Sequence, residues 1–173
     1  NSVIDYDEHS ASDYIRFFRN DGVTALDFVA SRENETGNKQ LFFIELKDVR
    51  GYEEQPETQQ KLANSARELT NTVGRNLRDT IYGIVLGNRK PEADNHAQWQ
   101  DFLKQLQRKD VQVIAVLWLE ADLTVLPAKP TRHAITREFK RKVSKLTRQV
   151  WACDQSDNPI PGLQVYDRKN NNN

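Results

Sequence analysis

The feature that most constrains the fold is an almost unbroken apolar run at residues 41–46, LFFIEL, which continues into KDVRGY. A run this short and this apolar is typical of a strand buried on both faces of a sheet. Glu45 and Lys47 interrupt its end two positions apart, so the period of a strand places both side chains on one face. Burying such charges is costly unless they pair with each other or with a metal. We therefore expect the chemistry of the chain at this strand end.

The pattern around this strand predicts an α/β order of elements. An apolar segment at 23–30 contains Asp27, and the polar stretch RENETGNK that separates it from a second strand at 40–50 favours a β-hairpin. Apolar residues at steps of three or four predict helices elsewhere. The remaining predicted elements are helices at 11–20, 57–87, 95–109 and 131–151, a buried strand at 111–119 and a short edge strand at 163–166.

These elements predict one mixed central sheet flanked by helices. Because a helix separates the strand at 40–50 from the strand at 111–119, we expect those two strands to pair in parallel through a right-handed crossover. We predict a single α/β domain over residues 1–169 and a disordered tail over 170–173. A single cysteine and the absence of an apolar run of membrane length predict a cytoplasmic protein that does not bind a membrane.

Charge is distributed unevenly, although the formal net charge is zero. The segment 129–148 is strongly basic and contains Glu138 as its one acid. Basic side chains that the last predicted helix turns outward could follow the phosphates of a nucleic acid. The alternative is an ordinary solvated helix face. The outward-facing basic residues are Arg137, Lys140, Arg141, Lys145 and Arg148.

The hairpin brings two acids onto neighbouring strands. If it forms, the carboxylates of Asp27 and Glu45 can converge. Two carboxylates with a strand carbonyl make an oxygen-rich site suited to Mg²⁺ or Mn²⁺. Lys47, one pleat from Glu45, could hold an attacking water or stabilise charge that develops on a phosphate. These groups together suit the hydrolysis of a phosphodiester.

This layout resembles the PD-(D/E)xK nuclease superfamily, the fold of restriction endonucleases and Holliday-junction resolvases. The resemblance covers about residues 10–120 and rests on Leu26-Asp27, the apolar hairpin, and Glu45-Leu46-Lys47 followed by a helix and a buried strand. It implies a restriction-endonuclease-like core of helix, hairpin, long helix, strand and helix. The chain departs from the family in having leucine before Asp27 where proline is usual, and one evident strand where two usually precede the Glu-x-Lys motif.

The resemblance also implies roles for individual residues. Asp27, Glu45 and the Leu46 carbonyl would be the metal ligands, and Lys47 would be the catalytic lysine. The upstream acid that the family often adds would be Asp13 or Glu8. A helper at the start of the following helix would be Gln60 or Lys61.

Three hypotheses follow from these patterns. The first is an endonuclease-like enzyme that hydrolyses DNA with Mg²⁺ or Mn²⁺. The second is a non-catalytic module that binds nucleic acid or protein on a degenerate nuclease fold, with Glu45 and Lys47 forming only an ion pair. The third is a structural domain with no role on nucleic acid. DNA is the expected partner, and a homodimer is an open alternative.

Overall fold

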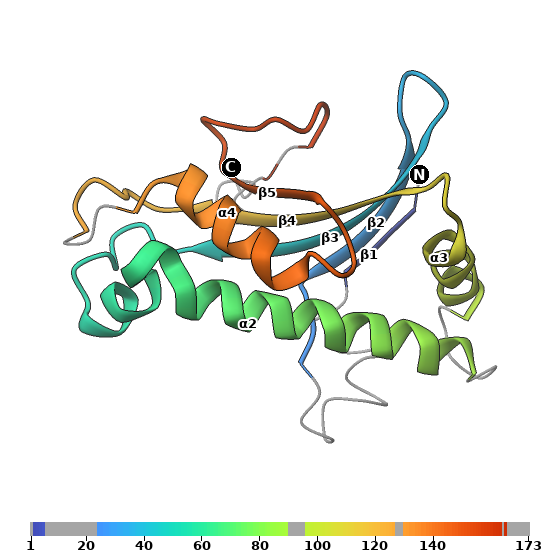
Figure 1. The fold of residues 1–173 in the computed structure, drawn as a ribbon, viewed down its shortest axis with the longest axis horizontal. Helices are drawn as coiled ribbons and strands as arrows, with labels where there is room; N and C mark the ends of the chain where they lie inside the picture. The colour runs from blue at the N-terminus through green and yellow to red at the C-terminus, as the bar shows by residue number, and fades with distance from the viewer. Residues whose placement is uncertain (1, 6–23, 90–95, 127–129, 164, 166–173) are drawn as a thin grey trace, which may run out of the picture.

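A computed structural model describes residues 2–5, 24–89, 96–126, 130–163 and 165. Their strands form one mixed sheet in the order β1-β2-β3-β4-β5. The first three strands pair antiparallel, and β3, β4 and β5 pair in parallel (Figure 1). The α/β class and the mixed sheet are therefore as predicted. The strands are β1 (Ser2–Asp5), β2 (Phe28–Glu33), β3 (Lys39–Asp48), β4 (Gln112–Glu120) and β5 (Gln149–Cys153).

The predicted hairpin is formed by β2 and β3, with Phe28 opposite Ile44 and Glu33 opposite Lys39. Its turn is held by Asn34, whose side-chain oxygen accepts hydrogen bonds from the backbone amides of residues 36 and 38. Gly37 in the turn has a φ of 79°, a conformation that costs glycine little. β1 was not predicted, and it places a second antiparallel neighbour beside β2. The helix predicted at 11–20 lies outside the described residues.

Two helices connect β3 to β4, α2 (Pro56–Asn88) and α3 (His96–Gln107). The predicted stripe of α2 faces the core, with Leu62, Val73 and Leu77 at most 2% exposed. The prediction of one continuous helix is wrong, because residues 63–66 leave the helical conformation and residues 64–66 have positive φ values. Figure 1 shows the resulting short first part of α2 beside the long second part.

The last predicted helix, at 131–151, is wrong in its second half. α4 (Arg132–Val143) begins at Thr131, whose side chain accepts a hydrogen bond from the amide of residue 134. It ends at residue 143, and β5 follows and pairs in parallel with β4. Val150 and Ala152 are buried in β5, and Trp151 between them is exposed, which is the alternation expected of a strand. Pairing with the edge of β4 satisfies backbone groups that a longer helix would have left unmet.

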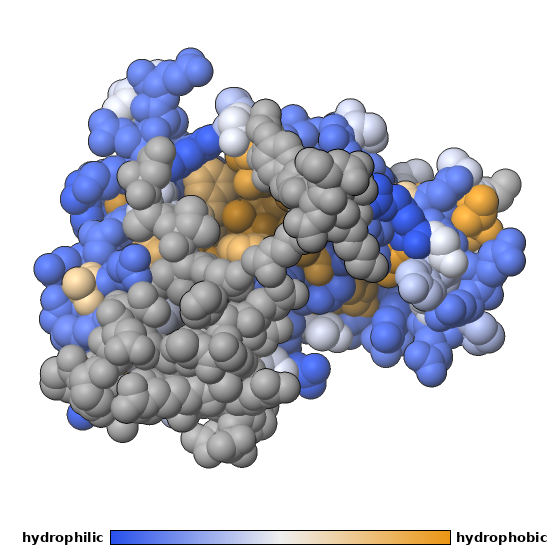
Figure 2. Space-filling model, turned by 180° about the vertical axis from the view of Figure 1, so that it is seen from behind, coloured by the Kyte–Doolittle hydropathy of each residue, from blue (hydrophilic) through white to orange (hydrophobic). Residues whose placement is uncertain are grey.

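The two faces of the sheet are covered differently. All three described helices contribute to the core on one face, which includes Val29, Phe43, Leu117 and Phe139. On the opposite face, Phe42, Ile44 and Trp118 pack with residues of the C-terminal segment. Seen from behind, this face shows an apolar surface in a hollow (Figure 2). Within the described residues, α2, α3 and α4 therefore cover only one face of the sheet.

The segment after β5 contributes to the second face of the sheet through residues 160, 163 and 165. Of the edge strand predicted at 163–166, residues 163 and 165 are described. Leu163 and Val165 are not in a strand, and both pack against the cluster that contains Phe42 and Trp118. None of the described helices combines the length and the apolar character needed to cross a lipid bilayer.

Candidate functional site

The candidate site lies where β3 ends and β2 begins. Val29, Glu45 and Lys47 point to the face of the sheet that the helices cover, since side chains two apart on a strand point the same way. Asp27 lies in a bend directly before β2, close enough for its charge to raise the pKa of Glu45. The structure thus brings together the two acids and the lysine that the sequence predicts.

Asp27 is tied to the middle residue of the Glu-x-Lys motif. Its Oδ2 accepts a hydrogen bond of 2.6 Å from the backbone amide of Leu46. Because the N–H and C=O of a strand residue point to the same neighbouring strand, the Leu46 carbonyl also faces the side on which Asp27 lies. The Asp27 carboxylate therefore lies on the side of β3 toward which the Leu46 carbonyl points.

Glu45 is the most deeply buried charged group of the site, with 1% of its surface exposed. Its Oε1 lies 2.7 Å from Lys47 Nζ and accepts a hydrogen bond of 3.2 Å from Asn76 Nδ2 on α2. Its Oε2 is also buried and has no hydrogen-bond partner within the described part of the chain. An unmet buried acceptor costs about 1–3 kcal/mol, and more when it is charged.

The surroundings of Glu45 oppose its charged form. Burial raises the pKa of Glu45 above its ordinary value of 4.5, and the nearby charge of Asp27 adds to that increase. Lys47 and the hydrogen bond from Asn76 act in the opposite direction. Shifted acids with a specific charged neighbour are common at functional sites. A bound cation would favour the charged carboxylate.

α2 fixes the strand end on which Asp27 sits. The backbone amide of Leu26 donates a hydrogen bond of 2.9 Å to Thr80 Oγ1. One residue earlier on the helix, Asp79 Oδ2 accepts a hydrogen bond of 2.9 Å from Thr24 Oγ1. The helix thus holds the segment before β2 at two points, while Asn76 holds Glu45 one turn away.

The residues present fit a hard divalent cation. Asp27 and Glu45 supply carboxylate oxygens, Leu46 supplies a carbonyl, and Asn76 Oδ1 is a buried amide oxygen without a hydrogen-bond partner among the described residues. Mg²⁺ and Mn²⁺ prefer such oxygen ligands. No group of three or more His, Cys, Asp or Glu that could hold a metal occurs in the described ranges. Asp13 and Glu8, the predicted upstream acids, lie outside those ranges.

Lys61 is on a different part of α2 from the residue that contacts Glu45. It is exposed on the first part of α2, before the non-helical residues 63–66. Asn76 lies in the second part of the same helix and makes the contact with Glu45. The role predicted for Lys61 stays a prediction.

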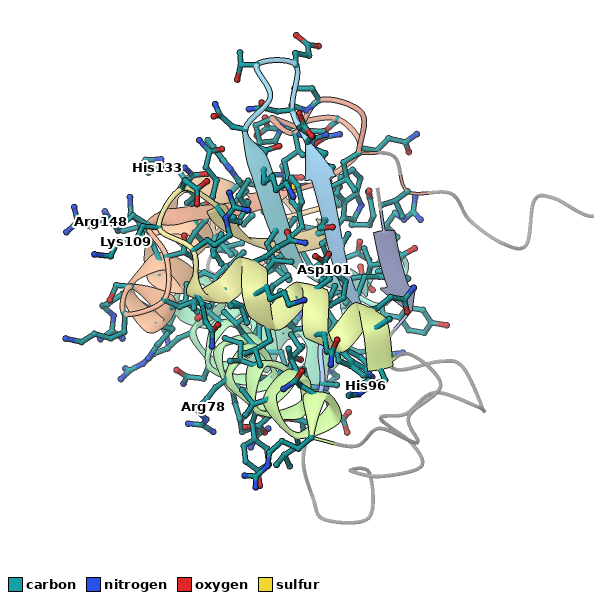
Figure 3. All side chains as sticks on the ribbon, turned by 90° about the vertical axis from the view of Figure 1, so that its right-hand side faces the viewer. Arg78, His96, Asp101, Lys109, His133 and Arg148 are labelled. Atoms are coloured by element: carbon teal, nitrogen blue, oxygen red, sulfur yellow. The ribbon has the colours of Figure 1, made fainter. Side chains whose placement is uncertain are left out.

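The basic residues predicted to face outward are all exposed: Arg137, Lys140, Arg141, Lys145 and Arg148. They do not form one helical face, because α4 ends at Val143 and the last two follow it. Glu138 partly neutralises the group, since its Oε1 lies 2.7 Å from Arg141 Nη2. In Figure 3, Arg148 and Lys109 extend outward on the side of the molecule where α4 lies.

Sequence reasoning missed Asn76. The signal that could have found it is a polar residue between two buried apolar ones, Val73 and Leu77, on the inner face of a long helix. A buried asparagine is uncommon unless its amide has partners. Cys153 is buried, and burial raises the pKa of its thiol to about 12, which disfavours the thiolate that a nucleophile needs.

Comparison of the chain with protein-family models, with curated proteins and with solved structures finds no match. The resemblance to the PD-(D/E)xK nucleases therefore rests on the residues and on the geometry of the strand end.

Proposed function

We propose that this chain hydrolyses phosphodiester bonds in DNA with Mg²⁺ or Mn²⁺, on a restriction-endonuclease-like core. The observation that carries the proposal is the buried Glu45 carboxylate, which has one unpartnered oxygen and lies beside a second acid and a lysine. The mixed sheet supports it further, because a hairpin followed by a helical crossover and a parallel strand is the order that the resemblance implies.

Each residue of the strand end has a distinct part in this proposal. Asp27, Glu45 and the Leu46 carbonyl hold the cation, which when bound supplies positive charge to the scissile phosphate. Lys47 orients the attacking water and stabilises the negative charge that develops on the phosphate. With 37% of its side chain exposed, Lys47 can reach a substrate and still contact Glu45.

Cleavage of duplex DNA with Mn²⁺ or Mg²⁺ tests this function. Lys47→Ala should reduce the cleavage rate by about 10²–10³-fold, the usual cost of removing one group that stabilises transition-state charge. Lys39→Ala is the matched control, because Lys39 is exposed at the opposite end of the same strand. Unchanged cleavage by Lys47→Ala and Glu45→Ala together would refute the assignment.

A non-catalytic nucleic-acid-binding module is the second candidate function. It is favoured by the exposed basic residues on and after α4. The helix that packs against α4, α2, adds exposed Arg75 and Arg78. In this case the salt dependence of DNA binding should be steep, with no metal requirement. Joint reversal of Lys140 and Lys145 to glutamate should weaken binding, while reversal of Lys104 on α3 serves as the control.

A further inference from the structure

The side chains of Glu45 and Asn76 are hydrogen-bonded to each other inside the protein. Each of them retains one side-chain oxygen without a hydrogen-bond partner among the described residues. Asn76 Nδ2 donates to Glu45 Oε1 at 3.2 Å, which orients the two planar groups toward each other. Glu45 Oε2 and Asn76 Oδ1 are both buried and lack a hydrogen-bond partner within the residues that the structure describes. Asn76 is 7% exposed and Glu45 is 1% exposed, so bulk water does not readily satisfy either oxygen.

Two buried acceptor oxygens without donors, on side chains that are hydrogen-bonded to each other, are suited to a positive ion. When Glu45 is ionised, neither group can satisfy the other at these atoms, because a carboxylate oxygen and an amide oxygen both only accept hydrogen bonds. A carboxylate with an amide oxygen is a ligand pair that hard cations such as Mg²⁺, Mn²⁺ and Ca²⁺ use.

We propose that Asn76 is an additional cation ligand, which supplies its Oδ1 to the same divalent ion that Glu45 and Asp27 hold. The inference rests on the proposed function and extends the ligand set from the strands to α2. It also explains how a site with two described acids can hold a divalent ion, since the third side chain is a neutral amide.

The packing of α2 keeps Asn76 in place for this role. Thr80 anchors the next turn of the helix to the backbone of Leu26. On the other side, α2 approaches α4 closely at Gly74, where an added Cβ would lie 3.3 Å from Lys142 Cβ. A ligand carried on a rigid helix is held more accurately than one carried on a loop.

The test is calorimetric titration of the full chain with Mn²⁺, together with thermal unfolding with and without Mn²⁺. Asn76→Ala should weaken Mn²⁺ affinity by about 10–100-fold, the range seen when a group that supports a metal is removed. Asn76→Asp keeps the oxygen and adds charge, so it should bind Mn²⁺ at least as tightly as the original chain. Without metal, Asn76→Asp should unfold at a lower temperature, because it adds a second buried carboxylate beside Glu45. Asn71→Ala, at an exposed asparagine of the same helix, should change neither property.

Four outcomes separate the possibilities. Weaker binding by Asn76→Ala with full binding by Asn76→Asp supports the inference. Unchanged Mn²⁺ affinity in Asn76→Ala overturns it and leaves the proposed function standing, with a trapped water as the partner of the two oxygens. Equal weakening by Asn76→Ala and Asn76→Asp also overturns it, because Asn76 then acts only as a hydrogen-bond donor to Glu45. Absence of Mn²⁺ binding in the original chain overturns both the inference and the proposed metal-dependent function.

Discussion

Replacing Glu45 by glutamine tests whether the buried charge is present for a cation. Without metal, Glu45→Gln should raise the free energy of unfolding at pH 8. Burial raises the pKa of Glu45, and an acid with a raised pKa destabilises the folded state once the pH exceeds its ordinary value of 4.5. Below that pH the carboxyl is protonated in both states and the difference disappears. The stabilisation by glutamine should therefore grow as the pH rises from about 4.5 through the raised pKa of Glu45.

Two opposing contributions set the size of this effect. The buried, unpartnered Oε2 costs about 1–3 kcal/mol, and a glutamine amide can remove that cost by donating to Asn76 Oδ1. The lost ion pair with Lys47 costs about 0.2–1 kcal/mol, because the lysine side chain is 37% exposed. The net stabilisation is about 1–2 kcal/mol. For a chain of this size it corresponds to a rise in Tm of about 2–8 °C.

The assay is urea and thermal unfolding in a chelator and in saturating Mn²⁺. At a Mn²⁺ concentration of about 100 times Kd, the original chain should gain about 2.7 kcal/mol, and Glu45→Gln should lose most of that gain. Glu53→Gln is the control. Glu53 is also buried, but a hydrogen bond of 3.1 Å from the Asp122 amide holds the pKa of its carboxyl below the ordinary value. Its neutralisation should therefore lower stability at pH 8. A chain destabilised by Glu45→Gln, with its Mn²⁺ response intact, would show that Glu45 is only an ion-pair partner.

Further predictions concern the site and the helices that support it. Mn²⁺ affinity should rise with pH through the raised pKa of Glu45 and then level off, with proton release measurable by calorimetry in buffers of different ionisation enthalpy. Gly87→Ala should lower the free energy of unfolding by about 1–3 kcal/mol, because its Cβ would lie 3.0 Å from the Trp99 ring; an unchanged Tm would contradict the packing of α3 on α2. Ser65→Gly should raise the free energy of unfolding by about 0.5–1 kcal/mol. Serine at a φ of 60° costs about 1–2 kcal/mol, and the entropy of glycine offsets about half of it. Ser65→Val should do the reverse, and equal stability of the two variants would argue against the left-handed turn in α2.

Local sequence patterns were enough to predict β3 and β4, whereas the strand predicted at 23–30 is β2 at Phe28–Glu33, which begins five residues later and leaves Asp27 just before it. The apolar runs that became β3 and β4 are buried on both faces, and such runs have few alternatives in a chain of this length. The polar stretch between two strand-like segments predicted the hairpin, and the two-residue period placed Glu45 and Lys47 on one face. The hairpin also brings Asp27, just before β2, close to Glu45.

Local patterns failed where the same spacing of apolar residues fits both a helix and a strand. The apolar residues at 143, 146 and 150 suit a helix, yet residue 150 also fits the alternation of a strand. The free edge of β4 decided the matter, because only a strand at 149–153 could pair with it. The basic residues consequently divide between α4 and the segment after it. The apolar stripe of α2 continues through residues 63–66, so it gave no indication of the turn there.

The sequence by itself determined the sheet's central strands and the acids and lysine at their end, since these depend on neighbours close along the chain. Tertiary structure alone decided that β5 would pair with β4 and that Asn76 would meet Glu45 across 31 residues of sequence. Burial, which raises the pKa of Glu45 and leaves its Oε2 unmet, is likewise a property of packed helices and sheet. Contacts between distant segments depend on how whole elements pack, and no local periodicity encodes that arrangement.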